Sequence, residues 1–570
     1  MKQSTILVLA LVTCAALAGL WTVGGSDATA RSPGGALASD EGARVSDGTR
    51  VSDENVRAEN VRTIARRIAE RDTDLPGPIR NWYGSPDRPL LWADPHSYHA
   101  ETLPAVLDQA RLEGLTGAEL AADEIRRNLD RLDAGLYSDS VRADAEVAVS
   151  TAFLRIAKLY LQGSDRRVEM EVAWHIRPDS APGIDVLSVV SRDGPATAVD
   201  SVRPVLPLYD RTVATLRDLH ERRDEGAGWS EIAETDVAEP GDSMAIVRKA
   251  RARLVSGIDR REAEMAQRGT DRPSRFDPDL ARAIAHFQGR HGIEIDSVIG
   301  PETLAAMNVP LEERIDDLRV NLDRIRWLPR DMGERAILVN VAGFELRVLE
   351  DNRPVMDMGV VVGRPSWRTA VFDDTLEHLV VNPYWHVPES IEAEETLPKV
   401  RNDPDYLTAN DISVVPEDAN FGEPIDPSSI DWSSVSAASM PYDFRQEPGP
   451  ENALGQIKFM FPNRHSIYLH DTPADELFRE NFRAFSHGCI RVERPWELAR
   501  YILDTSSHDR DGDLAAVRDS TERTRIDLDH SLPVYIAYLT SWVDEDGTVS
   551  FHRDLYDRDP DARGATEVSP

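Results

Sequence analysis

The spacing of apolar residues changes along the chain, and this change is the strongest constraint on its fold. In the N-terminal half, apolar residues recur three and four positions apart, as at Leu103, Val106 and Leu107, which is the period of an amphipathic helix. From about residue 336 they alternate with other residues, as at Ile337 and Val339, which is the period of a strand. Helices followed by a mostly antiparallel β part predict a multidomain α+β protein.

Length and charge limit the architecture and the partners. The chain has 570 residues, and one hydrophobic core rarely extends beyond about 250–300 residues, so several domains are expected. Its 65 basic and 100 acidic residues give a formal net charge of −35. Because nucleic acid and anionic lipid are themselves negatively charged, neither is an expected partner.

The first thirty residues have the layout of a secretory signal. Lys2 precedes an apolar run over residues 6–23, and the small-residue stretch Ala28-Thr29-Ala30 follows it. The apolar run is also long enough to stay uncleaved as a membrane anchor. Both interpretations place the protein in the periplasm or cell envelope, with residues 31–74 as a disordered tether that runs into a helix.

Cys489 is the only cysteine beyond the N-terminal apolar segment, so no disulfide can form within the mature chain. It directly follows Ser486, His487 and Gly488. A free cysteine is often a buried apolar residue, but these neighbours are poor core residues. A catalytic thiol needs a base nearby and a glycine that lets backbone N–H groups approach an oxyanion. The motif therefore predicts a nucleophilic cysteine.

A second histidine can supply the base. Residues 466–469 alternate like a strand that ends at His470, and fifteen residues separate His470 from Ser486. The polar segment between them can return the chain so that His470 lies beside Cys489. One cysteine with one or two histidines is the minimum set for covalent acyl transfer, in which the thiol attacks a carbonyl and a histidine moves the proton.

These residues resemble the L,D-transpeptidases with a YkuD-type catalytic domain, whose signature is a histidine, a spacer of similar length, serine or threonine, and then His-Gly-Cys. Residues 381–388 and 445–455 resemble the large periplasmic branch of that family, and the resemblance extends over about residues 82–559. It implies a helical scaffold domain over 75–240, a small three-helix peptidoglycan-binding domain over 241–312 and a mostly antiparallel β catalytic domain over 313–559.

The resemblance also implies the chemistry. Such enzymes attack the bond after the third, diamino-acid residue of a peptidoglycan tetrapeptide stem, release the terminal D-Ala and pass the acyl group to the side-chain amine of another stem. Cys489 would be the nucleophile, His470 the base and His487 a residue that shapes the site. The N–H groups of Gly488 and Cys489 would bind the oxyanion.

Four more residues are expected to contact the substrate: Arg491, Tyr468, Trp385 and Ser486. Arg491 lies two residues after the nucleophile, and its guanidinium suits a bidentate hydrogen bond to a substrate carboxylate. The alternative for Arg491 is a structural ion pair with a neighbouring acid.

The segment around residues 244–309 resembles a peptidoglycan-binding domain of the three-helix type. We expect it to bind glycan strands, and the alternative is a spacer bundle that binds nothing. His286 and His291 suggest a zinc pair, but no matching Asp or third His is found at ligand spacing in the sequence. Neither a metal nor another cofactor is therefore expected.

A polar segment at about residues 414–440 is rich in Asp, Ser and Pro and has few periodic apolar residues. The resemblance implies a mobile cap over the catalytic cleft, and the alternative is a disordered insertion. Residues 560–570 are predicted to form an acidic tail without a chemical role.

Three functions fit the sequence. The first is an L,D-transpeptidase; the second is an L,D-carboxypeptidase, or another thiol peptidase, in which water replaces the amine; the third is a non-catalytic wall-binding scaffold, against which the complete motif argues. The expected partners are peptidoglycan stem peptides and glycan strands, with membrane contact only through the N-terminal segment. A thiol nucleophile in this family further implies acylation by carbapenems.

Overall fold

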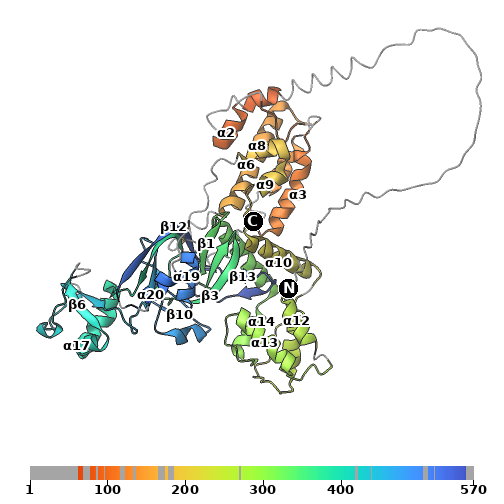
Figure 1. The fold of residues 1–570 in the computed structure, drawn as a ribbon. Coiled ribbons are helices and arrows are strands. Elements are labelled where there is room, and N and C mark those ends of the chain that lie inside the picture. Colours follow the sequence, from red (N-terminus) through yellow and green to blue (C-terminus); the bar gives the residue numbers. More distant parts are fainter. Residues whose placement is uncertain are drawn as a thin grey trace, which may run out of the picture. The chain divides into compact units, whose positions relative to one another are not determined.

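The protein is described by a computed structural model (Figure 1). The predicted signal segment, the tether up to residue 61 and the tail over 560–570 lie outside the described residues. Residues 62–68 form the helix into which the tether was expected to run. None of the described helices is both long and apolar enough to cross a membrane. The described residues are 62–68, 77–84, 88–94, 97–115, 122–132, 136–164, 174–176, 185–226, 228–268, 271–417, 422–437, 440–504, 511–518, 520 and 522–559.

The first helical region packs around one apolar cluster, which encloses the carboxylate of Glu146. Its helices include α2 (Gly77–Tyr83), α3 (His99–Leu112), α5 (Ala122–Asp130), α6 (Asp139–Gln162), α8 (Val186–Asp193) and α9 (Pro195–Asp200). Glu146 of α6 is fully buried and accepts hydrogen bonds from the Tyr83 hydroxyl at 2.6 Å and the Leu91 N–H at 2.5 Å. Because an unpaired buried carboxylate is costly, these donors fix the segment before α3 onto α6.

A smaller helical module follows. Its helices are α11 (Ala245–Val255), α12 (Arg260–Gln267), α13 (Pro278–Arg290) and α14 (Pro301–Asn308). The sequence predicted only three helices here, because α12 has few apolar residues. Instead, buried Glu262 of α12 accepts two hydrogen bonds from Arg290 of α13, at 2.5 and 2.9 Å. This ion pair helps to hold α12 against the module.

Two helices, α10 (Pro207–Asp224) and α15 (Leu311–Arg326), pack on each other and share a core with the β domain. Trp174 forms a bridge to Val371 of the β domain, and its ring meets Trp327 edge-on at a centroid distance of 5.0 Å. Arg324 of α15 is fully buried and pairs with Asp559 at 2.7 Å. These contacts fasten the helices to the sheet that carries the site.

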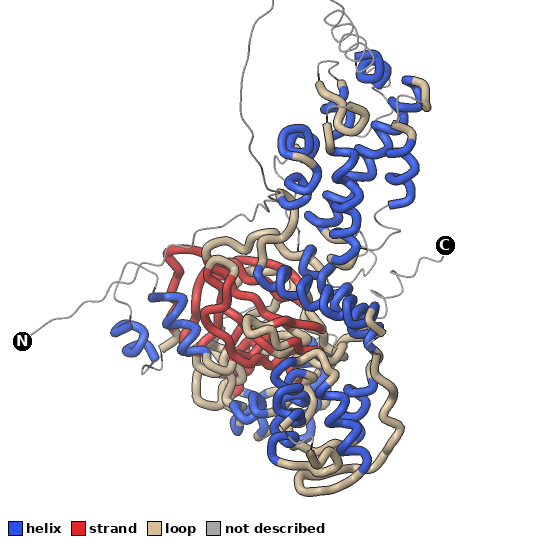
Figure 2. The backbone as a smooth tube through the Cα atoms, turned by 90° about the vertical axis from the view of Figure 1, so that its right-hand side faces the viewer, coloured by secondary structure: helices blue, strands red, loops and turns tan. Residues whose placement is uncertain are grey.

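The β domain is built on a nine-stranded sheet that closes on itself. The strand order is β10-β3-β11-β9-β8-β4-β12-β1-β2, and β2 also pairs with β3. Figure 2 shows the strands curling around a common interior. Most neighbouring pairs are antiparallel, as predicted, and β1–β12, β10–β3 and β11–β9 are parallel. The strands are β1 (Arg335–Asn340), β2 (Glu345–Glu350), β3 (Arg353–Gly363), β4 (Phe372–Val381), β8 (Ile457–Met460), β9 (Leu469–His470), β10 (Ala484–Ser486), β11 (Ile490–Val492) and β12 (Thr524–Ala537).

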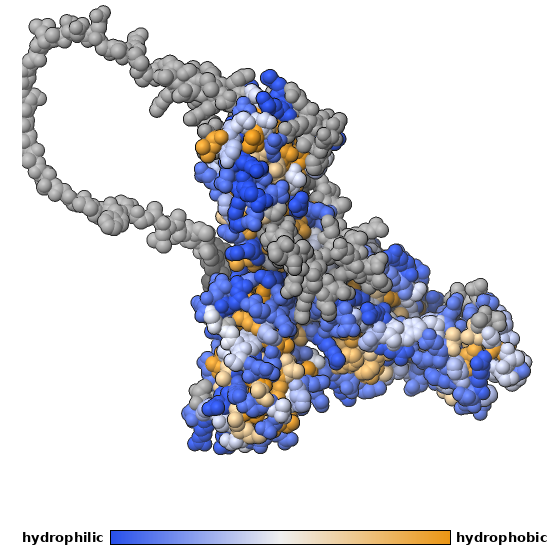
Figure 3. Space-filling view, turned by 180° about the vertical axis from the view of Figure 1, so that it is seen from behind, coloured by the Kyte–Doolittle hydropathy of each residue, from blue (hydrophilic) through white to orange (hydrophobic). Residues whose placement is uncertain are grey.

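Further elements follow the last motif strand and end the domain. Two helices, α19 (Pro495–Asp504) and α20 (Asp511–Arg518), lie between β11 and β12 in the chain. A hairpin of β13 (Ser541–Val543) and β14 (Val549–Phe551) follows β12. Hydrophilic residues cover most of the face seen in Figure 3, with apolar residues in smaller groups between them, as expected from the large net negative charge.

The cap is larger than predicted and has a hydrophobic core of its own. The sequence limited it to about residues 414–440 with few core residues, but Trp432 in that segment is 6% exposed and packs with Ile412 and Phe444. We use "cap" below for residues 385–446. Its elements are β5 (Trp385–His386), α16 (Glu389–Ile391), a π-helical turn (Glu392–Thr396), α17 (Leu397–Asn402), α18 (Tyr406–Ala409), β6 (Ile412–Pro416), a 3₁₀ turn (Pro427–Ser429) and β7 (Tyr442–Gln446), in which β7 is the central strand between β5 and β6.

Candidate active site

Cys489 lies in a tight turn that joins β10 to β11. Gly488 has a φ of +115°, a conformation in which a side chain would be strained. The Ser486 hydroxyl donates to the Cys489 carbonyl at 2.5 Å and accepts from the Gly488 N–H at 3.1 Å. The sequence predicted Ser486 to bind substrate and the Gly488 N–H to bind the oxyanion. In the structure both groups hold the turn, and Ser486 is only 3% exposed.

The Cys489 thiol is partly buried and faces the chain around β9. Sγ donates to the carbonyl oxygen of Ser466 at 3.8 Å. Burial raises the pKa of Cys489 above its ordinary value, although a hydrogen bond from the Tyr468 N–H and the charge of Lys458 act in the opposite direction. The resting residue is therefore a protonated thiol at neutral pH. A thiol in this state needs a base before it can act as a nucleophile, because the thiolate is the reactive form of cysteine.

His470 lies on the strand next to Cys489 and has the properties of a neutral base. β9 and β11 run parallel, with Leu469 opposite Ile490 and His470 opposite Arg491. Nδ1 of His470 donates to the Asp471 carbonyl at 2.5 Å, so Nε2 keeps its lone pair. Burial, followed by the charge of Arg491, lowers the pKa of His470 to about 3. His470 is therefore uncharged at physiological pH and able to accept a proton.

Two cations flank this base. Lys458 of β8 is paired in register with His470 of β9, and His470 is paired with Arg491 of β11, so the three residues form one row across the sheet. Nζ of Lys458 lies 3.6 Å from the centroid of the Tyr468 ring. Burial lowers the pKa of Lys458 to about 8. The sequence prediction missed Lys458, because its place beside the base depends on the register between two separate strands.

His487 connects the catalytic motif to the cap. Its Nε2 lies 2.7 Å from Oε1 of Glu395 and 2.7 Å from Nη2 of Arg364. Glu395 belongs to the π-helical turn and also pairs with Arg364 and Lys399, each at 3.5 Å. Burial acts to raise the pKa of Glu395, but the hydrogen bond from His487 and the charge of Lys399 help to hold it below its ordinary value. Protonated Nε2 donates to Glu395, whereas unprotonated Nε2 accepts from Arg364.

The remaining two predicted substrate residues differ in position. Tyr468 adjoins the nucleophile, because its hydroxyl is hydrogen-bonded to Cys489 and burial raises the pKa of this tyrosine. Trp385 instead lies in β5 of the cap, opposite Gln446, and packs against the cap core. The structure thus brings Tyr468, but not Trp385, into contact with the thiol.

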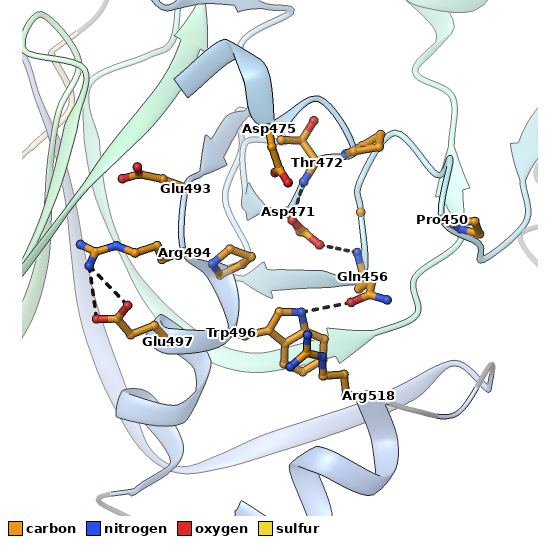
Figure 4. Close-up of a pocket in the computed structure, with 13 residues that line it drawn as sticks. Pro450, Gln456, Asp471, Thr472, Asp475, Glu493, Arg494, Trp496, Glu497 and Arg518 are labelled. Atoms are coloured by element: carbon orange, nitrogen blue, oxygen red, sulfur yellow. Dashed lines mark hydrogen bonds and ion pairs between the residues drawn. The ribbon is translucent and has the colours of Figure 1, made fainter. Parts of the chain in front are cut away.

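A cavity of about 450 Å³ adjoins the strand that carries the base. Figure 4 shows Asp471, the residue after His470, with its carboxylate accepting hydrogen bonds from the backbone of Gln456 and Thr472, each at 2.7 Å. Trp496 forms another wall, and its Nε1 donates to the Gln456 side chain at 3.2 Å. The cavity is open to solvent and has both polar and apolar walls, and the sequence did not predict it.

Asp259, Glu262 and His286 place three potential ligand atoms within 4.8 Å of one another. No Asp was expected at ligand spacing from His286, but the fold brings Asp259 to it at the start of α12, together with Glu262. However, Arg290 already binds both carboxylate oxygens of Glu262, and Asp259 caps α12 by accepting from the Glu262 N–H. A guanidinium in this position opposes a metal cation, so we interpret the cluster as structural.

Three family models match the chain. Residues 334–536 match the L,D-transpeptidase catalytic domain, residues 77–216 match the scaffold domain, and residues 266–307 match a model described as "Putative peptidoglycan binding domain". Over these ranges the chain is therefore similar to YkuD-type L,D-transpeptidase catalytic domains, to scaffold domains and to peptidoglycan-binding domains. This confirms the resemblance seen in the sequence.

Individual relatives match parts of the chain. A protein of Haemophilus influenzae named "Putative L,D-transpeptidase" is 36% identical over 244 residues, which are 42% of this chain and 48% of the relative, so the chain spans about half of that relative's length. The match to an L,D-transpeptidase from Mycobacterium smegmatis covers 37% of this chain and 60% of the matched chain, with 10% sequence identity and a TM-score of 0.16. One from Xylanimonas cellulosilytica covers 54% of this chain and 100% of its own, at 12% identity and a TM-score of 0.16.

Proposed function

We propose that this protein is an L,D-transpeptidase that crosslinks peptidoglycan stem peptides through an acyl-enzyme on Cys489. The reaction cleaves the bond after the third residue of a tetrapeptide donor, releases D-Ala and forms a 3→3 crosslink. The observation that carries this proposal is the placement of a protonated thiol next to the parallel strand that holds a buried, neutral histidine.

In the acylation step, Nε2 of His470 takes the thiol proton while Sγ of Cys489 attacks the carbonyl carbon of the third stem residue. The carbon–nitrogen bond then breaks, and His470 returns the proton to the nitrogen of the departing D-Ala. A thioester on Cys489 remains. Positioned proton transfer of this kind typically contributes about 10²–10⁴-fold to the rate.

In the transfer step, the side-chain amine of a second stem attacks the thioester. His470 removes a proton from the amine and returns it to the sulfur, which leaves a new amide bond and the free thiol. Water in place of the amine gives a tripeptide, which is the carboxypeptidase reaction. The contact between Glu395 and His487 supports transfer, because a cap held over the motif limits the access of water to the thioester.

Product analysis tests this proposal. The purified protein is incubated with tetrapeptide-containing muropeptides, and the products are separated and weighed by mass spectrometry. We expect crosslinked dimers and free D-Ala from the wild type and neither from Cys489→Ala. Tripeptide without dimers would assign the protein as a carboxypeptidase, and unchanged tetrapeptide would leave only the wall-binding role.

The other modules have supporting roles in this proposal. The scaffold domain over 75–240 and the peptidoglycan-binding domain over 241–312 hold glycan strands near the catalytic domain over 313–559, and an N-terminal signal or anchor directs the protein to the cell envelope. Binding to insoluble sacculi should fall when surface side chains of α13 and α14 are replaced. Unchanged binding would identify the peptidoglycan-binding domain as a spacer.

A further inference from the structure

Two cations beside Cys489 have no carboxylate partner among the residues that the structure describes. Lys458 and Arg491 are both partly buried, and within the described part of the chain no carboxylate lies in ion-pair distance of either, although Glu476 acts on Arg491 from farther away. Nε of Arg491 is buried without a hydrogen-bond partner. Buried charges are normally paired, so this arrangement is that of a site for an anion from outside the chain.

The sheet places this pair around the reacting groups. Lys458 and Arg491 lie on either side of His470 in the row across β8, β9 and β11. Both charges act on Cys489 and on His470. Neighbouring strands are about 4.8 Å apart, so the two backbones are separated by about two such spacings, and both long side chains can reach a ligand that covers the base.

We propose that Lys458 and Arg491 together bind the terminal carboxylate of the donor stem, and this rests on the proposed function. In a tetrapeptide donor the residue that leaves is the last one, so its carboxylate lies one residue beyond the carbonyl that Cys489 attacks. Consecutive residues are about 3.8 Å apart, which brings the carboxylate into the region of the row. The enzyme would then select the last peptide bond of a stem, because a longer or amidated stem has no carboxylate one residue after the attacked carbonyl.

The contrasting role for the two cations is stabilisation of the Cys489 thiolate alone. That role makes no distinction between a donor with a terminal carboxylate and the same donor with a terminal carboxamide. A carboxylate site, in contrast, favours the acid. The two roles can therefore be distinguished by comparing charged and uncharged ligands, whereas loss of activity alone would not distinguish them.

The first test compares acylation of Cys489 by tetrapeptide donors that end in D-Ala or D-alaninamide. We expect the wild type to prefer the acid by at least about tenfold, Lys458→Met to lose most of this preference, and Lys458→Arg to keep it. Lys249→Met, which removes a lysine of α11 in the peptidoglycan-binding module, should match the wild type. A donor that is amidated only on the side chain of its third residue keeps its terminal carboxylate, so it should be acylated as fast as the unmodified acid. If it reacted as slowly as the D-alaninamide donor, the cations would bind the side-chain carboxylate, and the proposal would be overturned.

The second test does not depend on peptidoglycan chemistry. The rates at which iodoacetate and iodoacetamide alkylate Cys489 are measured by peptide mass spectrometry, which separates Cys489 from Cys14. We expect the iodoacetate-to-iodoacetamide rate ratio to fall about tenfold in Lys458→Met and to be restored in Lys458→Arg. Equal decreases for both reagents would show thiolate stabilisation alone and overturn the proposal. A lowered ratio in a protein that does not process muropeptides would retain the anion site and reject the proposed function.

Discussion

The chemistry of the site depends at the residue scale on His470 being uncharged while two cations lie beside it. Burial disfavours the imidazolium, and the charge of Arg491 disfavours it further, so the pKa of His470 falls to about 3. The hydrogen bond from Nδ1 to the Asp471 carbonyl fixes the tautomer. These features give a base that stays free to accept a proton across the physiological pH range.

Replacing His470 should slow acylation without preventing folding. Because His470 moves the proton in both steps of the proposed reaction, His470→Ala should reduce the acylation rate by about 10²–10⁴-fold. Single-turnover mass spectrometry with a tetrapeptide donor measures the rate, and His530→Ala, at an exposed histidine, is the control. Near-normal acylation in His470→Ala together with a large loss in His487→Ala would transfer the role of base to His487.

The carboxylate preference should depend on pH. Since the pKa of Lys458 is about 8, this residue is charged below that pH and becomes neutral as pH rises through it, so the preference for the acid donor should decline above about pH 8. The groups that interact with Lys458 are Tyr468, His470, Cys489, Arg523 and His386. The ratio of acid to amide acylation rates between pH 6 and 10 gives the profile. In Lys458→Arg the ratio should stay constant over this pH range. An equally constant ratio in the wild type would contradict the assignment of Lys458 to the donor carboxylate.

The cap illustrates at the element scale how a nonlocal core escapes sequence analysis. Ile412, Trp432 and Phe444 come from separate segments, each of which has too few apolar residues for a period to be visible. The strands of the β domain, by contrast, were predicted because their alternation is local. Lys458 was missed for the same reason as the cap core, since the pairing of β8 with β9 is not encoded in either strand alone.

The cap should depend on Glu395 for its attachment to the catalytic motif. Glu395→Gln removes the charge that faces His487 and Arg364, and a half-exposed charge pair is worth about 1 kcal/mol or less, which is roughly a fivefold change in an equilibrium. We expect faster amide exchange across residues 385–446 and a severalfold rise in the ratio of tripeptide to dimer. Glu394→Gln, at an exposed position in the same turn, is the matched control. An unchanged product ratio would assign Glu395 a structural role only.

At the scale of the whole molecule, buried polar contacts join the helical parts to the sheet. Arg290 of α13 donates to the Val549 carbonyl at 3.0 Å, and Arg324 of α15 pairs with Asp559 near the end of the described chain. Neither contact could be predicted from the sequence, because the partners are more than 200 positions apart. The modules are therefore fastened to one another by specific contacts in addition to their chain connections.

Breaking one such contact should destabilise the protein and leave the site intact. Asp559→Ala leaves the guanidinium of Arg324 buried without its counter-charge, which typically costs about 3–5 kcal/mol. Removing Asp527 from its exposed pair with Arg525 should cost about 1 kcal/mol or less. Chemical denaturation of both variants measures the free energies, and equal losses would mean that the Arg324–Asp559 pair does not stabilise the fold.

In the proposed reaction, Cys489 becomes acylated by the donor stem, which loses its last residue. The most direct measurement is the intact-protein mass after brief incubation with a tetrapeptide donor and no acceptor, followed by peptide mapping of the modified residue. We expect a mass increase equal to the donor minus D-Ala, located on Cys489, absent from Cys489→Ala and blocked by prior treatment with a carbapenem. Consumption of the donor without any adduct on Cys489, or an undiminished reaction in Cys489→Ala, would contradict the account.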